Sequence, residues 1–311
     1  MSILGIKAFA PASIGNIGIG FDILGMAIEQ PGDEVIAKKS NTPGLRITRI
    51  TGHQGKLPYE VEQNTAGMAA LRLLEHLGET GLGIELEILK KMPLGSGLGS
   101  SAASAVAAVL AVSELLRTGL SKRDLLPFAC QGEQVASGGF HADNVAPSLL
   151  GGIVLIRDNE TLDVHRLHVP RGLHATVVYP QLHILTKDAR AILKPEVPLG
   201  AYVQQSANIA GFVVGCFNGD VELIGRCLRD EIIEPQRAGL ITGFYDVQEA
   251  ALAEGALGCS ISGAGPSVFA LSANSLIAEN VGQAMQRAFA KHGVESQVFL
   301  SGVNQEGAVI C

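Results

Sequence analysis

Alternating apolar and polar residues predict strands in the first half of the chain. Ile84, Leu86 and Ile88 alternate with Glu85 and Glu87, and this period of two is typical of a strand with one buried face. Stretches of this kind, or short apolar runs, are expected as strands at Ile3–Ala10, Asp33–Lys38, Leu45–Ile50, Gly83–Lys91 and Ile153–Ile156.

Apolar residues three and four apart predict helices between these strands. Such spacing covers Asn64–Leu77, and Gly78 is the expected stop. The alanine-rich stretch Ser101–Leu116 has strong helix propensity. Ser121–Asp124 has the pattern of a capping box, which opens a further helix that carries Glu133 near its end.

The second half of the chain mixes both patterns. Helices are expected at Asp188–Leu193, Leu199–Phe217, Val221–Arg229, Asp246–Glu254 and Leu276–His292, and strands at Ala175–Tyr179, Leu257–Ile261, Ser267–Leu271 and Ser296–Leu300. Because helices and strands follow one another without a strict βαβ rhythm, the predicted fold class is α+β. A chain of 311 residues exceeds the usual size of one core. The charged, turn-rich stretch Arg157–Val164 is the expected boundary between domains at 1–160 and 161–311.

Composition narrows the class of protein. The chain is 47% hydrophobic and 17% charged, which suits a globular protein and argues against disorder. Its net charge is −7 and it has no long run of Lys or Arg, so nucleic acid and anionic membranes are not expected as partners. Five scattered cysteines without a CxxC pair fit a reducing compartment. No apolar run reaches the length of a membrane span and no signal-type segment opens the sequence, so a cytoplasmic location is predicted.

A glycine-rich loop lies between the predicted strand Gly83–Lys91 and the predicted helix Ser101–Leu116. It reads Pro93-Leu-Gly-Ser-Gly-Leu-Gly-Ser-Ser-Ala102. Glycines let several backbone N–H groups point at one spot, and the start of a helix adds partial positive charge there. This loop is therefore predicted to bind an anion such as a phosphate.

Two common glycine-loop patterns fit this segment poorly. The P-loop pattern requires Lys after its last glycine, and Ser100 stands there instead. The residues Gly97–Ala102 do satisfy the dinucleotide pattern G-x-G-x-x-A. That pattern also needs a second strand after the helix, and a capping box follows the helix here. The P-loop is excluded, and a dinucleotide-dependent oxidoreductase is a distant alternative.

Three motifs together resemble the GHMP kinases, the family named after galactokinase, homoserine kinase, mevalonate kinase and phosphomevalonate kinase. The loop Pro93–Ala102 resembles the family's second motif, while Pro11–Asp22 and Gly258–Ser267 fall where the first and third are found. The resemblance spans almost the whole chain. It implies an N-terminal domain like that of a ribosomal protein and a ferredoxin-like C-terminal domain.

Within the family, four segments are most similar to the homoserine kinases. They are Asn16–Asp22, Gly132–Pro147, Thr186–Arg190 and Glu234–Arg237. The resemblance implies transfer of the γ-phosphoryl group of ATP to the side-chain hydroxyl of L-homoserine, with Mg²⁺, in threonine synthesis. Homodimers are common in this group, so a homodimer is expected.

The resemblance assigns residues to ATP and to the metal ion. Asn64 corresponds to a position that contacts adenine, although by itself it is an ordinary helix N-cap. The metal ligands are Glu133 and a loop serine, either Ser101 or Ser100. The remaining nucleotide contacts fall on Pro93, Leu94, Gly95, Ser96, Gly97, Leu98, Gly99, Ser100, Ser101, Ala102 and Ala103.

The amino-acid substrate requires groups for both of its charges. Its carboxylate suits the guanidinium forks of arginine, and its ammonium suits carboxylate or amide oxygens. The residues assigned to it by resemblance are Asn16, Asp22, Asn144, Arg190, Arg237 and Gly263.

Asn144 and Arg190 are the predicted catalytic residues. Mevalonate kinase has Asp where this chain has Asn144, and Asn cannot accept a proton at neutral pH. Asn144 is therefore expected only to orient the hydroxyl group. The neighbouring Asp143 is either the base or a residue that structures the loop, and the structural role is favoured.

Two further functions compete with this one. Another GHMP kinase, such as a mevalonate or archaeal shikimate kinase, would lack the setting of Arg190 and Arg237 and the Asn at position 144. A non-catalytic relative that binds a metabolite need not keep Ser101, Glu133 and all three glycine-rich motifs. The presence of these residues favours an enzyme.

Overall fold

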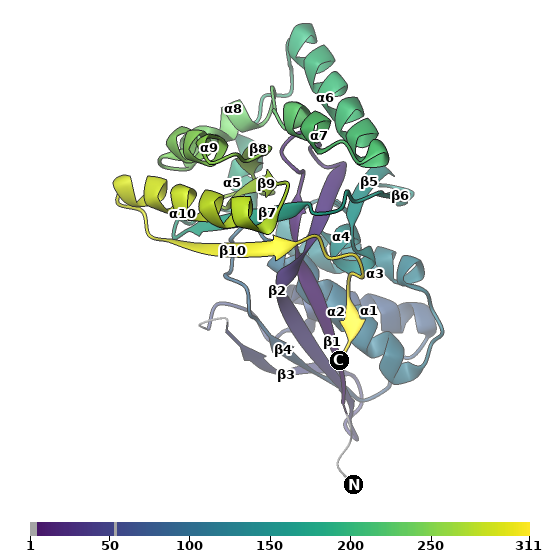
Figure 1. The fold of residues 1–311 in the computed structure, drawn as a ribbon. Coiled ribbons are helices and arrows are strands. Elements are labelled where there is room, and N and C mark those ends of the chain that lie inside the picture. Colours follow the sequence, from purple (N-terminus) through teal and green to yellow (C-terminus); the bar gives the residue numbers. More distant parts are fainter. Residues whose placement is uncertain (1–4, 53–54) are drawn as a thin grey trace.

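The computed structural model describes residues 5–52 and 55–311, which form two β-sheets with helices packed on them (Figure 1). The strands are β1 (Ile6–Gly15), β2 (Leu24–Lys39), β3 (Leu45–Thr51), β4 (Ile84–Leu89), β5 (Ile153–Asp158), β6 (Asp163–Leu167), β7 (His174–Pro180), β8 (Gly258–Ile261), β9 (Val268–Ser272), β10 (Ser296–Gly302) and β11 (Val309–Ile310). The α-helices are α1 (Thr65–Leu77), α2 (Ser100–Leu116), α3 (Lys122–Ser137), α4 (Val145–Leu150), α5 (Thr186–Ala191), α6 (Leu199–Asn218), α7 (Val221–Cys227), α8 (Glu234–Arg237), α9 (Phe244–Ala253) and α10 (Ser275–Lys291). Short 3₁₀ turns lie at Val61–Gln63 and Ala238–Leu240.

The first sheet holds the β1–β2 hairpin at its centre. Its order is β11-β1-β2-β4-β3, with β5 paired to β2 and β6 to β5. Helix α2 packs against β1 and β2, and α1 and α3 pack against α2. Ala103, Val106 and Ala107 of α2 are fully buried. Small side chains let this helix lie close to the sheet, and its first turn lies beside Asp33 of β2.

The second sheet is antiparallel, in the order β10-β7-β9-β8. In chain order these strands are the fourth, first, third and second, and α10 connects β9 to β10, as in the ferredoxin-like βαββαβ arrangement. Phe212 and Phe269 join the core of the first sheet. Phe244 and Phe289 belong to a smaller cluster of buried residues beneath α9 and α10. The α+β class predicted from the sequence is confirmed.

Most predicted elements are present with small shifts at their ends. Strands β1 and β2 run further than expected because the hairpin continues through the first glycine-rich motif; Ile3, the expected start of the first strand, lies outside the described residues. The elements α4, α8, β6 and β11 were not foreseen.

The stretch Arg157–Val164 is the turn region of the β5–β6 hairpin in the first sheet. The chain therefore moves to the second sheet after β6, and β11 returns to pair with β1. The domain limits at 1–160 and 161–311 stay a prediction.

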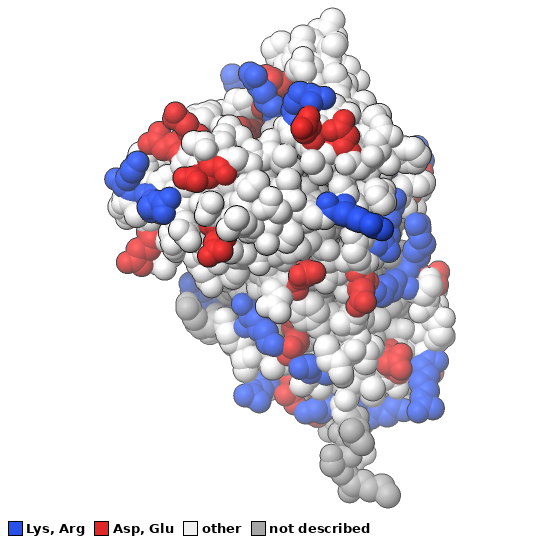
Figure 2. All heavy atoms as spheres, in the orientation of Figure 1, with Lys and Arg blue, Asp and Glu red and all other residues white. Residues whose placement is uncertain are grey.

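Helix α6 is 20 residues long and contains no charged side chain. Leu199 and Phe217, near its two ends, are 76% and 82% exposed. Figure 2 shows white surface over the top of this helix, where it projects from the rest of the chain in Figure 1. Within the two described stretches, no helix combines the length and hydropathy that would let it cross a membrane.

Candidate active site

A cavity of about 340 Å³ lies where three segments from distant parts of the chain meet. These segments are the tip of the β1–β2 hairpin, the loop between β4 and α2, and the turn between β8 and β9. Their residues Asp22, Gly97 and Gly263 all line the cavity. Its volume falls in the range of sites that hold metabolite-sized ligands.

The glycine-rich loop requires its glycines because other backbone segments touch it. Gly97 and Gly99 have positive φ angles, which L side chains rarely adopt. A Cβ atom on Gly97 would lie 2.6 Å from the Ser262 carbonyl oxygen, and one on Gly99 would lie 2.2 Å from Ser13 Oγ. The backbone N–H of Ser13 also donates to the Leu98 carbonyl at 3.0 Å. The three glycine-rich motifs thus form one continuous wall.

The two serines at the start of α2 point in different directions. Ser101 Oγ donates to Glu133 Oε1 at 2.8 Å, at the edge of the cavity. Ser100 Oγ donates instead to Asp33 Oδ2 at 2.8 Å, beneath the loop. The positive end of a 17-residue helix meets the cavity here, so a phosphate and a cation can be held side by side.

Glu133 has an altered acidity. Burial raises its pKa to about 7, the Ser101 hydroxyl opposes this rise, and the negative charge of Asp143 adds to it. A buried carboxylate beside a hydroxyl offers oxygen ligands that suit Mg²⁺. In residues 5–52 and 55–311, no group of three or more His, Cys, Asp or Glu side chains is placed to bind a metal. Mg²⁺ usually takes only one or two ligands from the protein, with water and phosphate oxygens as the rest.

Asn64 is the N-cap of α1, as its place in the sequence suggested. Its Oδ1 accepts from the N–H of Ala66 at 3.1 Å, and its Nδ2 donates to the Pro58 carbonyl at 2.9 Å. Asn64 also lines the cavity at the end nearest Pro58. A contact with adenine stays a prediction.

On the opposite side of the cavity, the hairpin tip is joined to the β8–β9 turn. Asn16 has a positive φ angle; its Nδ2 donates to the Gly263 carbonyl at 3.0 Å, and its Oδ1 accepts from the Asp22 N–H at 2.9 Å. The Gly263 N–H donates to the Gly15 carbonyl at 3.0 Å. One asparagine thus sets the conformation of the hairpin tip and attaches it to the third motif.

Two arginines lie over the aromatic ring of Phe21, with their guanidinium carbons 5.0 Å and 5.3 Å from its centre. Arg190 forms a two-pronged ion pair with Asp22, at 2.8 Å and 3.1 Å. Arg237 is buried and donates to the carbonyls of Ala189 and Gly263. Burial, followed by the charge of Arg190, lowers the pKa of Arg237. Asp22 and Arg190, expected at opposite ends of the substrate, are paired with each other here.

Asp143 and Asn144 lie between these two halves of the site. Burial, together with the charge of Asp22, raises the pKa of Asp143 to about 7. Asn144 Nδ2 donates to Asp143 Oδ2 at 3.2 Å, and Ser13 Oγ donates to Asn144 Oδ1 at 3.0 Å. Both contacts fix the orientation of the Asn144 amide. The geometry is consistent with a supporting role for Asp143, which stays a prediction.

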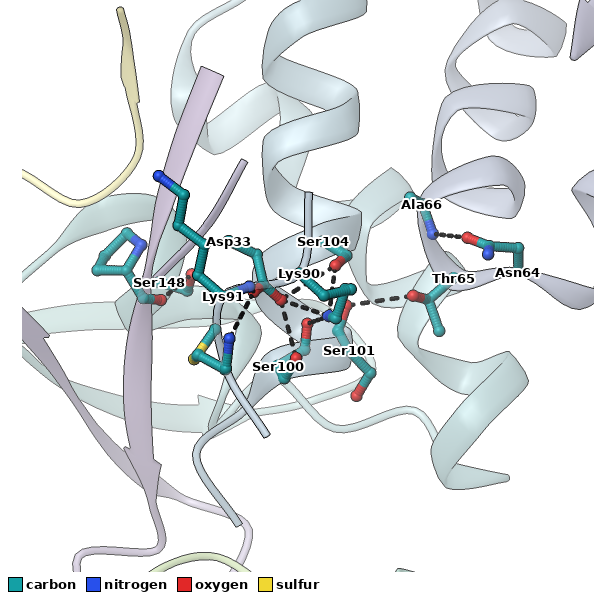
Figure 3. A network of polar contacts seen from close by, with 12 residues as sticks. Asp33, Asn64, Thr65, Ala66, Lys90, Lys91, Ser100, Ser101, Ser104 and Ser148 are labelled. Carbon is teal, nitrogen blue, oxygen red and sulfur yellow. Dashed lines mark hydrogen bonds and ion pairs between the residues drawn. The ribbon is translucent and has the colours of Figure 1, made fainter. Parts of the chain in front are cut away.

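The sequence analysis missed a buried ion pair beneath the glycine-rich loop, between Lys90 and Asp33 (Figure 3). A signal for it existed. Lys90 continues the inward face of the strand that carries Ile84, Leu86 and Ile88, so the period of two, extended by one step, places a lysine on an apolar face.

The structure gathers most of the predicted residues around one cavity. Those that line it are Asn16, Asp22, Asn64, Leu94, Gly95, Ser96, Gly97, Gly99, Ser100, Ser101, Glu133, Asn144, Arg190, Arg237 and Gly263. Pro93, Leu98, Ala102 and Ala103 do not line it, and the last three are fully buried. These three side chains belong to the hydrophobic core that supports the loop and the start of α2.

Two family models and several known proteins match this chain. The family described as "GHMP kinases N terminal domain" matches residues 64–152, and "GHMP kinases C terminal" matches residues 212–291. A protein named homoserine kinase from Chlorobium phaeobacteroides (strain BS1) is 44% identical over 98% of this chain and 99% of its own. One from Xylella fastidiosa (strain 9a5c) is 45% identical over 97% and 92%. The crystal structure of homoserine kinase from Cytophaga hutchinsonii ATCC 33406 is 51% identical, with a TM-score of 0.96, over 99% of this chain and 97% of that one.

Proposed function

Because the chain belongs to the GHMP kinase family, we propose that it transfers the γ-phosphoryl group of ATP to the side-chain hydroxyl of L-homoserine. One observation carries the proposal. Ser101, at the start of α2, and Glu133, near the end of α3, line the same cavity as the group formed by Asp22, Arg190 and Arg237. One half of the cavity suits phosphates and a cation, and the other suits a small zwitterion. The product, O-phospho-L-homoserine, belongs to threonine synthesis.

The ATP half relies on positioning and charge. The loop and the start of α2 would hold the phosphates, and Ser101 and Glu133 would hold Mg²⁺, because Ser100 Oγ is already bound to Asp33. When bound, Mg²⁺ neutralises charge on the phosphates. Asn64 lines the same cavity and would contact the adenine base.

The homoserine half suits an amino acid with a side-chain hydroxyl. Arg190 or Arg237 would receive the carboxylate, while Asp22 and the amide oxygens of Asn16 or Asn144 would receive the ammonium. Binding would exchange part of the Asp22–Arg190 ion pair for contacts with the substrate. Asn144, held by Ser13 and Asp143, would orient the hydroxyl towards the phosphate. Phosphoryl transfer gains most of its rate from such positioning.

The test is ADP release from Mg-ATP with L-homoserine, mevalonate, shikimate and galactose assayed in parallel. Activity with homoserine alone is expected. Activity with another of these alcohols, and none with homoserine, would refute the substrate and leave a GHMP kinase. No turnover of any alcohol, with metabolite binding retained, would point to a non-catalytic relative.

We further propose that two copies of the chain associate through the outer face of α6. Leu199, Val203, Ala210, Val214 and Phe217 recur along this face at helical spacing and are exposed. An apolar face of this length is unusual on a monomer. A second copy offers the same uncharged face, and an isologous contact would bury both faces while the remaining surface carries the net charge of −7.

Sedimentation equilibrium would test the association. The wild type is expected at twice the chain mass of 32.4 kDa, and the double variant Leu199→Glu/Phe217→Glu at the chain mass. Leu276, on α10, is 68% exposed and provides a matched control, Leu276→Glu, which should leave the dimer intact. A dimer that survives the double variant would rule out this interface.

We also place the enzyme in the cytoplasm. Cys130, Cys216, Cys227, Cys259 and Cys311 are all free thiols, which suits a reducing compartment. Fractionation of cells that produce the protein should place it with other cytoplasmic enzymes.

A further inference from the structure

Two oppositely charged side chains meet in the interior below the glycine-rich loop. Strands β2 and β4 are antiparallel, with Glu34 opposite Leu89, so Asp33 and Lys90 lie opposite each other one step beyond. The side chain of Asp33 is fully buried and that of Lys90 is 3% exposed. Removing a pair of charges from water costs free energy, and this cost indicates that the pair has a specific role in the structure around it.

Asp33 joins the two ends of the loop. Its Oδ1 accepts from the N–H of Lys91 at 2.8 Å and from that of Met92 at 3.2 Å, just before the loop begins. Its Oδ2 accepts from Ser100 Oγ at 2.8 Å and Ser104 Oγ at 3.3 Å, in the first two turns of α2. A single carboxylate therefore holds residues on both sides of Pro93–Gly99 (Figure 3).

Lys90 completes this arrangement. Its ammonium contacts Asp33 Oδ2, donates to the Ser100 carbonyl at 2.8 Å and donates to Ser104 Oγ at 2.7 Å. An ammonium group has three N–H donors, and these three contacts use all of them. Lys90 lines the cavity, but with its donors used it holds the wall of the cavity together. It also balances the negative charge of Asp33, which would otherwise oppose an anion at the start of α2.

We propose that Asp33 and Lys90 are positioning residues that hold the phosphate-binding loop in its binding conformation, so that this pair controls the affinity for ATP and leaves the affinity for homoserine unaffected. The proposal rests on the proposed function only in taking ATP as the ligand of the loop. The network includes Ser100 and Ser104 but no residue of the Asp22–Arg190 side. A defect in it should therefore appear in one substrate's KM.

The experiment compares Lys90→Met, Asp33→Asn and the double variant in the ADP-release assay, with each substrate varied in turn. Each single variant is expected to raise KM for ATP by about tenfold or more, equivalent to about 1.4 kcal/mol, and to change KM for homoserine by less than about twofold. Because the two residues act as one unit, the double variant should cost less than the product of the two single effects.

Lys91 provides the matched control. It is the next residue along, its side chain is exposed, and it pairs with Glu34, which also pairs with Lys7. Lys91→Met should keep both KM values, since the Lys91 side chain bonds Glu34 and takes no part in the Asp33–Lys90 network, and Glu34 retains Lys7 as its partner. If the single variants fail to fold, the double variant, which leaves no unpaired buried charge, and Ser104→Ala remain to be measured. Both should raise KM for ATP selectively.

Three results would overturn the inference: an unchanged KM for ATP in the folded variants, equal rises for both substrates, or single effects that multiply in the double variant. A wild type that fails to phosphorylate homoserine would refute the proposed function instead. Nucleotide-dependent shifts in Tm would still test the pair in that case, because they report ATP binding without turnover.

Discussion

Replacing Glu133 by Gln is expected to stabilise the ligand-free protein at pH 8 while removing most of its activity. The carboxylate is held beside Ser101 and near Asp143, and its pKa rises from 4.5 to about 7. At about 1.4 kcal/mol per pKa unit, the ionised form costs the folded state about 3 kcal/mol. Gln keeps an oxygen that can accept the Ser101 hydroxyl and carries no charge.

The sign of the pH dependence follows from the raised pKa. Below the ordinary value of 4.5 the group is protonated in both the folded and the unfolded state, and it costs nothing. As pH rises towards about 7 the unfolded state loses its proton first, so the wild type loses stability relative to Glu133→Gln. The difference should be small at pH 5 and reach its full value at pH 8.

Urea unfolding at pH 5 and pH 8, without ATP or Mg²⁺, would measure the difference. The exposed Glu114 on α2 supplies the control Glu114→Gln, for which no pH-dependent gain is expected. The raised pKa of Glu133 would be wrong if Glu133→Gln is less stable than the wild type at pH 8. It would also be wrong if the gain in unfolding free energy is the same at pH 5 and pH 8. The kcat/KM of Glu133→Gln should fall by at least about 100-fold. Replacing a residue that only supports a metal ligand typically lowers metal affinity or activity by about 10–100-fold, and Glu133 is expected to be a ligand itself.

Four further substitutions test individual roles. Ser101→Ala should lower kcat for ATP-dependent turnover by about tenfold or more, because it removes a metal ligand. Ser100→Ala loses the hydrogen bond to Asp33, so it should cost about 1 kcal/mol of stability and raise KM for ATP while kcat is kept; a larger fall in kcat for Ser100→Ala than for Ser101→Ala would exchange their roles. Asp143→Asn should retain much of kcat if Asp143 only holds its neighbour, and a loss of 10³-fold or more in steady-state assays would make it the general base. Arg190→Lys cannot form a two-pronged pair, so KM for homoserine should rise about tenfold with KM for ATP unchanged; equal rises would contradict this assignment.

Local chemistry made several features predictable. The capping box at Ser121, the N-cap at Asn64 and the left-handed Gly78 at the end of α1 all occur as their residue types suggested. Each depends on hydrogen bonds within a few residues of chain. The glycine-rich loop followed from the same kind of reasoning, since it needed only a strand, glycines and a helix start.

Contacts between distant residues could not be predicted in the same way. Asp22 and Arg190 are 168 positions apart and form a pair, although each had been assigned to a different end of the substrate. The return of β11 to pair with β1 depends on the whole chain in between. Only the packed structure brings such segments together.

The two serines at the start of α2 show both kinds of determination, by local sequence and by tertiary packing. The sequence alone determined that a glycine-rich loop ends in Ser100 and Ser101 at the start of a helix, because local pattern suffices for that, and it left open which of the two was the predicted metal ligand. Successive residues of a helix project about 100° apart, so the rotation of α2 decides the matter. That rotation is set by the packing of α2 on β1 and β2 and by the buried Asp33. Ser100 donates a hydrogen bond to Asp33, and Ser101 therefore points to Glu133.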